Sequence, residues 1–335
     1  MPVSHIVIEA TRGNAVESLH LVSAAVVDAG GQAVTSHGDI ETPVYPRSAI
    51  KVMQALPLVE SGAADRYGFG ARELSLACAS HSGEAPHVAL AADILGRAGL
   101  GEANLECGCH WPFDQKVAIA LAQGGGTPNQ LHNNCSGKHA GFLCTAVHLG
   151  EETQGYVGAA HPVQRRARQA IADLTDTEVG EETPSGIDGC SIPTYAASLR
   201  AFALGFGRLT GGTGISQARA AAGRRLMDAC MAEPFFMAGT QRACVALMEA
   251  APGRVFAKTG AEGVFCGAVP ELGFGFALKA HDGGTRAAES AVAQLISDIW
   301  RPQDAALSER YAELARHTLR NWEGTAVGEI RPRRA

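Results

Sequence analysis

Segments in which apolar and polar residues alternate occur at the two ends of this chain, and a long stretch of helical periodicity separates them. A period of two is typical of strands, and a period near 3.6 is typical of helices. Gly30 and Gly31, between two β-branched runs, indicate a hairpin. The alternating segments are residues 4–10, 20–28 and 32–37 near the start and residues 254–260, 263–269 and 272–279 near the end.

The helical pattern begins near Ser48 and closes first at Gly62, with Pro57 expected to kink or shorten that helix. Thr285 to Trp300 is an amphipathic helix, and residues 331–335 are expected to fray. The middle of the chain predicts helices over residues 70–79, 85–98, 115–122, 136–149, 162–174, 190–202, 216–231 and 239–250.

This order of elements predicts an α+β fold, in which both chain ends build one antiparallel sheet and a large helical insertion packs with it. We assign the sheet part to about residues 1–47 and 252–335 and the helical part to about residues 48–251. No linker that would separate independent domains is found between them, so we expect a single unit over residues 1–335.

Composition narrows the function classes. Of 335 residues, 46% are apolar and 19% are charged, and the net charge of −6 comes without a basic patch, so we expect no nucleic-acid partner. No apolar run approaches the roughly 20 residues of a membrane-spanning helix. The start of the chain lacks a signal-peptide pattern, and the nine cysteines are scattered and odd in number. Both features favour reduced thiols and a cytoplasmic location.

Three short motifs carry nucleophiles and lysines: Ser48-Ala-Ile-Lys51, Ser80-His81-Ser82 and Lys258-Thr259-Gly260. Residues three apart share a helix face, so the Lys51 amine can reach the Ser48 hydroxyl. The S-x-x-K motif alone is weak evidence for catalysis, because a helix N-cap serine followed by a solvated lysine has the same sequence pattern. Together the three motifs reproduce the order found in serine β-lactamases and penicillin-binding proteins, which indicates acyl transfer through a serine ester.

A second group of polar residues precedes an apolar helix in the middle of the chain. Cys135 and Cys190 are soft ligands, and Asp188 and His139 are their candidate companions, which makes a zinc site arguable. The alternative is that both cysteines fill small gaps beside loops. No role can be assigned to Cys107 or Cys109.

Five segments together resemble the rhizobial-type, or class 3, L-asparaginase family, and the resemblance covers nearly the whole chain. It implies a β-lactamase-like fold, a homodimer, and hydrolysis of L-asparagine to L-aspartate and ammonia. The segments are residues 46–57, 78–84, 133–139, 187–190 and 258–263.

The resemblance also implies roles for individual residues. Ser48 with Lys51, and Ser80 with Lys258, match the two serine–lysine pairs of that family. Cys135, Lys138 and Cys190 match its zinc site, where the lysine amine is a ligand. Because the amine must lose its proton to bind metal, the affinity for metal should fall as the pH is lowered. Zinc is expected to be structural or to position substrate. Asp188 matches the acidic residue beside that site.

The substrate-binding residues are expected to be Arg47, Asp188, His139 and Ala261, of which Ala261 offers a backbone N–H to an oxyanion. We expect Ser48 to attack the amide carbon with Lys51 as base, although the order of the two serines stays open. Two enzymatic alternatives share the fold: a glutaminase, and a serine hydrolase acting on β-lactams or peptides. A non-catalytic zinc-binding protein on a hydrolase scaffold is the alternative of another class.

Overall fold

The computed structural model describes residues 4–180 and 183–333, and the chain divides into two units. Unit 1 comprises Met1–Ala49, Ala197–Gly211 and Ala246–Ala335, and unit 2 comprises Ile50–Ala196 and Gly212–Val245. Unit 1 therefore joins both ends of the chain, as the alternating segments predict.

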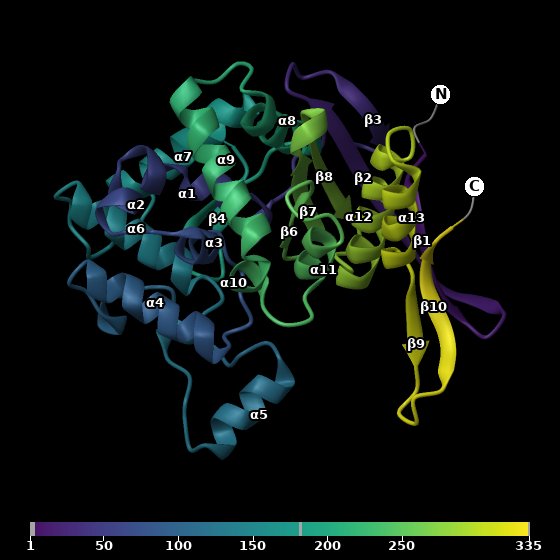
Figure 1. The fold of residues 1–335 in the computed structure, drawn as a ribbon, viewed down its shortest axis with the longest axis horizontal. Coiled ribbons are helices and arrows are strands. Elements are labelled where there is room, and N and C mark those ends of the chain that lie inside the picture. The colour runs from purple at the N-terminus through teal and green to yellow at the C-terminus, as the bar shows by residue number, and fades with distance from the viewer. Residues whose placement is uncertain (1–3, 181–182, 334–335) are drawn as a thin grey trace. The chain divides into compact units, whose positions relative to one another are not determined.

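Unit 1 is built on an antiparallel sheet in the order β6-β7-β8-β2-β1-β10-β9, with β3 also paired to β2. Ile8 of β1 lies opposite Pro332 of β10, which joins the two chain ends. The β1–β2 hairpin and the β9–β10 pair run on past the helices of this unit (Figure 1). The strands are β1 (Ile6–Arg12), β2 (Ala15–Asp28), β3 (Ala33–His37), β6 (Phe256–Gly260), β7 (Val264–Val269), β8 (Phe274–Ala280), β9 (His317–Arg320) and β10 (Ala326–Pro332).

Helices cover both faces of this sheet. All six residues of β7 are buried, and because neighbouring side chains point to opposite faces, neither face is open to water there. α8 (Leu199–Gly211) contacts β2, β7 and β8, while α12 (Thr285–Trp300) contacts β1, β8 and β10 and packs with α13 (Ala305–Leu314). α8 thus belongs to the sheet, rather than to the helical part to which the sequence pattern assigned it.

Unit 2 is a bundle centred on two buried helices. α1 is buried from Lys51 to Leu58, and α6 is buried from Ser136 to Ala146. α5 stands off from the other helices of this unit (Figure 1) and buries none of its residues. The helices are α1 (Lys51–Glu60), α2 (Ala63–Arg66), α3 (Ala71–Ala77), α4 (Ala85–Arg97), α5 (Gln115–Gln123), α6 (Ser136–His148), α7 (Pro162–Thr175), α9 (Gln217–Ala232) and α10 (Pro234–Ala238); α11 (Ala243–Glu249) follows.

The α+β class is confirmed, and several local predictions are corrected. The helix predicted over 190–202 is wrong for most of its length, because β4 (Ser185–Ile187) and β5 (Pro193–Tyr195) form a hairpin up to residue 195 and α8 begins only at Leu199. Pro57 does not shorten α1, which continues to Glu60. Residues 331 and 332 belong to β10 instead of fraying, and residues 334–335 lie outside the described residues. No helix in the described ranges is long and apolar enough to cross a membrane.

Candidate active site

Lys51, the lysine of the S-x-x-K motif, is the first residue of α1 and is fully buried. Its Nζ donates to the carbonyl oxygen of Ala79 at 2.5 Å and lies 2.9 Å from Sγ of Cys135. These two contacts connect the first motif to the loop that carries Ser80 and to the start of α6. Three segments that are distant in the sequence therefore meet at one amine.

Ser80 follows α3 in a loop whose backbone is held on both sides. The Ser80 N–H donates to the Met237 carbonyl at 2.9 Å, and the His81 N–H donates to the Asn134 carbonyl at 3.1 Å. Nδ2 of Asn134 donates to the Ser80 hydroxyl oxygen at 2.8 Å. Because Ser80 Oγ accepts this bond, its own proton is left for transfer to a base. Asn134 was not identified from the sequence as a site residue; its only signal was its place directly before Cys135.

His81 braces this loop. Its Nδ1 accepts from the Gly83 N–H at 3.1 Å, so Nε2 carries the proton and donates to Ser136 Oγ at 2.9 Å. Burial, followed by the neighbouring His87, holds the pKa of His81 well below its ordinary value. The ring is neutral and structural in this arrangement.

Cys135, Lys138 and Cys190 form one buried cluster, each no more than 3% exposed. Nζ of Lys138 donates to Sγ of Cys190 at 3.1 Å. The Cys135 thiol donates to Cys190, which lowers the pKa of Cys190 and raises that of Cys135. Burial opposes charge on Lys138, but the negative charges of Cys190, Cys135 and Asp188 together outweigh it, so the pKa of Lys138 lies above its ordinary value.

The donors of this cluster suit zinc. Thiolate sulfur and amine nitrogen are ligands that zinc accepts, and a cluster this buried would exclude competing water. In the part of the chain that the structure describes, no three His, Cys, Asp or Glu side chains gather as a metal site. The predicted zinc set has only two such side chains, Cys135 and Cys190, and takes its third donor from the Lys138 amine.

The hairpin between β4 and β5 brings Cys190 and Asp188 to the cluster. The Asp188 N–H donates to the Ile192 carbonyl at 2.8 Å, and Oδ1 of Asp188 accepts from the Gly189 N–H at 2.8 Å. This tight loop leaves Asp188 half-buried and turns Cys190 inward. The Asp188 carboxylate also acts to raise the pKa of Lys138, which indicates that its charge lies near the cluster.

His139 follows Lys138 on α6 and is fully buried. Nδ1 of His139 lies 2.7 Å from the Tyr156 hydroxyl, whereas Nε2 has no hydrogen-bond partner among the residues that the structure describes. Burial, then the Lys138 ammonium, holds the pKa of His139 well below its ordinary value. His139 is therefore a neutral ring with one polar atom unsatisfied.

The remaining predicted residues lie in unit 1. Ser48 is half-buried in a 3₁₀ turn (Arg47–Ile50), and the preceding Arg47 has a φ of 50°, a strained conformation that is often found at functional sites. A Cβ at Gly260 would lie 2.4 Å from the Pro46 carbonyl oxygen, so only glycine lets the end of β6 approach this turn. Lys258 is buried in β6, and Ala261 is exposed in the turn after it.

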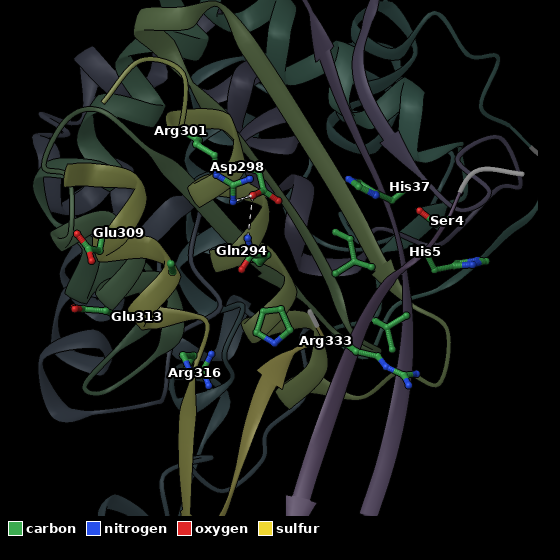
Figure 2. A pocket seen from close by; sticks show the side chains of 14 residues that line it. Ser4, His5, His37, Gln294, Asp298, Arg301, Glu309, Glu313, Arg316 and Arg333 are labelled. Atoms are coloured by element: carbon green, nitrogen blue, oxygen red, sulfur yellow. Dashed lines mark hydrogen bonds and ion pairs between the residues drawn. The ribbon is translucent and has the colours of Figure 1, made fainter. Parts of the chain in front are cut away.

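A cavity of about 790 Å³ in unit 1 contains none of these residues. Its wall combines the start of β1, α12, α13 and the end of β10, with both acidic and basic side chains (Figure 2). The chemistry predicted from the motifs therefore lies elsewhere. Two groups of predicted residues result. The group in unit 2 consists of Lys51, Ser80, Cys135, Lys138, His139, Asp188 and Cys190. In unit 1, the turn that carries Arg47 and Ser48 lies beside the end of β6, the strand that carries Lys258.

Two solved structures share a broad outline with this chain. A beta-lactamase from Mycobacterium bovis is 14% identical, with a TM-score of 0.41, over 88% of this chain and 94% of that chain. A D-alanine carboxypeptidase AmpC from Burkholderia cenocepacia is 12% identical, with a TM-score of 0.39, over 87% and 92%. Neither similarity reaches a TM-score of 0.5, so neither bears on function.

No curated protein matches the sequence. A family model described as L-asparaginase II, by contrast, matches residues 8–332, nearly the whole chain. The match includes every residue of both groups described above. The chain belongs to the L-asparaginase II family, and it is an amidohydrolase.

Proposed function

We propose that this L-asparaginase hydrolyses the side-chain amide of L-asparagine through a serine ester, with Ser48 as nucleophile and Lys51 as its base. The family match supports the substrate and the reaction class. One observation carries the residue assignment: the Lys51 amine touches both the Ser80 loop and Cys135 from the predicted zinc set. A solvated lysine, the alternative reading of S-x-x-K, would be exposed, whereas Lys51 is fully buried.

The contacts of Lys51 suit a general base. A neutral amine has two N–H donors and one lone pair. With the two donors directed to the Ala79 carbonyl and the Cys135 sulfur, the lone pair is left to accept the serine proton. Lys51 follows directly on the turn that carries Ser48, so the chain itself keeps base and nucleophile close.

In the first step, Ser48 Oγ bonds to the side-chain carbonyl carbon of asparagine and its proton passes to Lys51. The carbon–nitrogen bond then breaks, and the leaving nitrogen takes up a proton to depart as ammonia. Ser80 and Lys258 are proposed to deliver that proton, with the backbone near Ser48 and Ala261 stabilising the oxyanion. Water hydrolyses the ester, which releases L-aspartate and restores the serine.

Cys135, Lys138 and Cys190 would hold zinc in this enzyme. When bound, zinc supplies a fixed positive charge that orients the substrate, since the serine already supplies the nucleophile. Asp188 and His139 would offer an anion and an N–H donor to the amino acid, and Arg47 a cation for its carboxylate. These groups would balance both charges of a zwitterionic amino acid.

Two further properties belong to the same proposal. The resemblance to class 3 asparaginases supports a homodimer, which sedimentation of the purified protein tests. The nine free thiols support a reducing compartment, and hence the cytoplasm. Fractionation of cells that express the protein tests this location.

The proposed function is tested by ammonia release from L-asparagine, with L-glutamine and a chromogenic cephalosporin in parallel. We expect release from L-asparagine and none from the cephalosporin. Ser48→Ala, Ser80→Ala and Lys258→Ala should each reduce turnover, and label from substrate should accumulate on Ser48. If labelling persists in Ser48→Ala, Ser80 is the nucleophile instead of Ser48. Cephalosporin hydrolysis without ammonia release would exclude L-asparagine as the substrate.

A further inference from the structure

Tyr156 and His139 form a hydrogen-bonded pair in the interior of unit 2, and both side chains are 0% exposed. The Tyr156 hydroxyl lies 2.7 Å from His139 Nδ1, and it accepts the backbone N–H of Glu106 at 3.0 Å. Nε2 of His139 is buried, and in the described part of the chain no group is placed to hydrogen-bond with it. The pair therefore ends at a single unsatisfied atom.

Counting protons decides which nitrogen of His139 carries hydrogen. If the Tyr156 hydroxyl donates to Nδ1, Nε2 carries the proton and one buried group is unsatisfied. If Nδ1 donates to the hydroxyl instead, the hydroxyl proton and Nε2 are both left without partners. Buried polar groups are nearly always paired, so the arrangement with one unsatisfied group is favoured. Nε2 of His139 is then an N–H donor.

Besides His139, one bond holds the Tyr156 hydroxyl directly, and two more hold the backbone around it. Glu106 fixes it through its backbone N–H, and the Glu106 carboxylate accepts the Gly155 N–H at 2.7 Å. Nε2 of Gln164 donates to the Tyr156 carbonyl at 3.0 Å. If the Tyr156 ring turned away from His139, its hydroxyl would lose the bond from the Glu106 N–H as well as the contact with His139. The ring T-stacks on His139 at a centroid distance of 5.4 Å, which fixes the imidazole plane as well.

We propose that Tyr156 is a positioning residue that holds His139 as its Nε2–H tautomer, and that this N–H donates to an oxygen atom of the bound substrate. The second half rests on the proposed function. His139 adjoins Lys138 in sequence, and the charges of Lys138, Cys135 and Asp188 act on its ring. A buried donor without a partner destabilises the folded protein, so its presence beside that cluster is explained if a ligand pairs with it.

The tautomer is tested without any activity measurement. In protein labelled with ¹⁵N-histidine, long-range proton–nitrogen spectra distinguish Nε2–H from Nδ1–H rings, and the signal lost in His139→Gln identifies His139. We expect the Nε2–H pattern in the wild type and a shift toward Nδ1–H in Tyr156→Phe. A wild-type ring protonated on Nδ1 would overturn the proposal, whatever the enzyme hydrolyses.

The substrate contact is tested by kinetics with a matched control. Tyr156→Phe should raise KM for L-asparagine about fivefold or more and change kcat little, since a hydrogen bond to bound substrate is weakened. Tyr311→Phe is the control, because Tyr311 is equally buried and its hydroxyl donates to the Leu247 carbonyl at 2.7 Å. It should lower thermal stability to a similar extent and leave KM unchanged.

A double-mutant cycle separates positioning from simple support of the fold. In a His139→Leu background, Tyr156→Phe should have no further effect on KM, because no ring remains to be oriented. Additive effects on KM, or an equal rise in Tyr311→Phe, would overturn the proposal. If the protein releases no ammonia from L-asparagine, the proposed function fails, and the tautomer spectrum still decides the role of Tyr156.

Discussion

Asn134 is the residue on which the orientation of Ser80 most directly depends. Its side chain donates to Ser80 Oγ, its carbonyl accepts from His81, and its N–H donates to Nε2 of His110 at 3.0 Å. A backbone held at both polar groups leaves the amide side chain little freedom. The serine hydroxyl is consequently oriented before substrate arrives, which is the condition for efficient proton transfer.

We predict that Asn134→Ala lowers kcat for L-asparagine about tenfold to a hundredfold, with a smaller change in KM, because the hydroxyl of Ser80 loses its fixed orientation. Steady-state ammonia release measures both constants. Asn104→Ala is a suitable control, since it also removes an asparagine side chain that makes a hydrogen bond, in this case by accepting the Gly101 N–H at 2.9 Å. Unchanged turnover in Asn134→Ala would separate Ser80 from the chemistry.

At the scale of elements, α6 brings the site together because it packs unusually close to α3. A Cβ at Gly137 would lie 2.3 Å from the Leu76 carbonyl oxygen, so the chain requires glycine between Cys135 and Lys138. Any side chain there would push the helix that carries Lys138 and His139 away from the loop that carries Ser80. Catalytic geometry and helix packing thus depend on the same position.

Gly137→Ala should therefore destabilise the protein by about 1–3 kcal/mol through overpacking. Gly96→Ala provides the matched control, because Gly96 lies within α4 and a Cβ there meets nothing within 4 Å. That control should be neutral or stabilising by up to about 1 kcal/mol, as helix propensity favours alanine. Urea unfolding of both variants measures the difference. Equal stability of the two would show that α6 can move away from α3 without cost.

The stacked rings of His81 and His87 predict loss of stability in acid. Their centroids are 4.8 Å apart, and burial lowers the pKa of both below the ordinary value of about 6.5. The unfolded chain binds protons at a pH where the folded protein does not. The stabilisation that the folded protein gains from these two neutral rings is therefore complete above pH about 6.5 and is lost as the pH falls below that value.

Urea unfolding between pH 7.5 and 5.5, with a chelator present so that metal release does not contribute, should show this decline. His87→Gln keeps a donor for the Phe235 carbonyl, which His87 Nε2 contacts at 2.9 Å, but removes one titrating ring. Its stability should vary less with pH than that of the wild type. An identical pH dependence in both proteins would assign the acid sensitivity to other groups.

How far the sequence predicts these elements depends on how local the signal is. Helices with strong periodicity, such as α4, α7 and α12, lie within two residues of their predicted bounds. The β4–β5 hairpin was mistaken for a helix because its residues are few and its pairing is short. The sequence does not predict β10 because its pairing with β1 at the other end of the chain leaves no local signal, and β9 pairs in turn with β10.

The same reasoning applies to the site. Ser48, Lys51, Ser80, Cys135, Lys138, Asp188, Cys190 and Lys258 could be named because short motifs contain them. Asn134 and Tyr156 could not be given roles, since their partners are residues 80 and 139, in other segments. A motif marks where reactive side chains occur, whereas the groups that orient them are identified only by the fold.

At the scale of the whole molecule, the proposed zinc joins segments that the sequence keeps far apart. Cys135 and Lys138 lie at the start of α6, while Cys190 lies in the β4–β5 hairpin. Cys135 contacts Lys51, and Lys138 contacts Cys190. The unfolded chain has no such preformed set of ligands. Metal binding should therefore stabilise the folded protein by mass action, by about 2.7 kcal/mol at free zinc about 100 times Kd.

We predict about one zinc per chain by elemental analysis of the purified protein, and a thermal midpoint that falls when a chelator removes it. Cys190→Ala should lose both the metal and the response to chelator. Cys144→Ala is the matched control: Cys144 is also buried, lies on α6, and donates to the Ile94 carbonyl at 3.8 Å, away from the predicted ligands. It should bind zinc normally, even if its own midpoint is lower. Zinc retained in full by Cys190→Ala would exclude the Cys135–Lys138–Cys190 cluster as the metal site, and the buried lysine–thiolate contact would then be a structural ion pair.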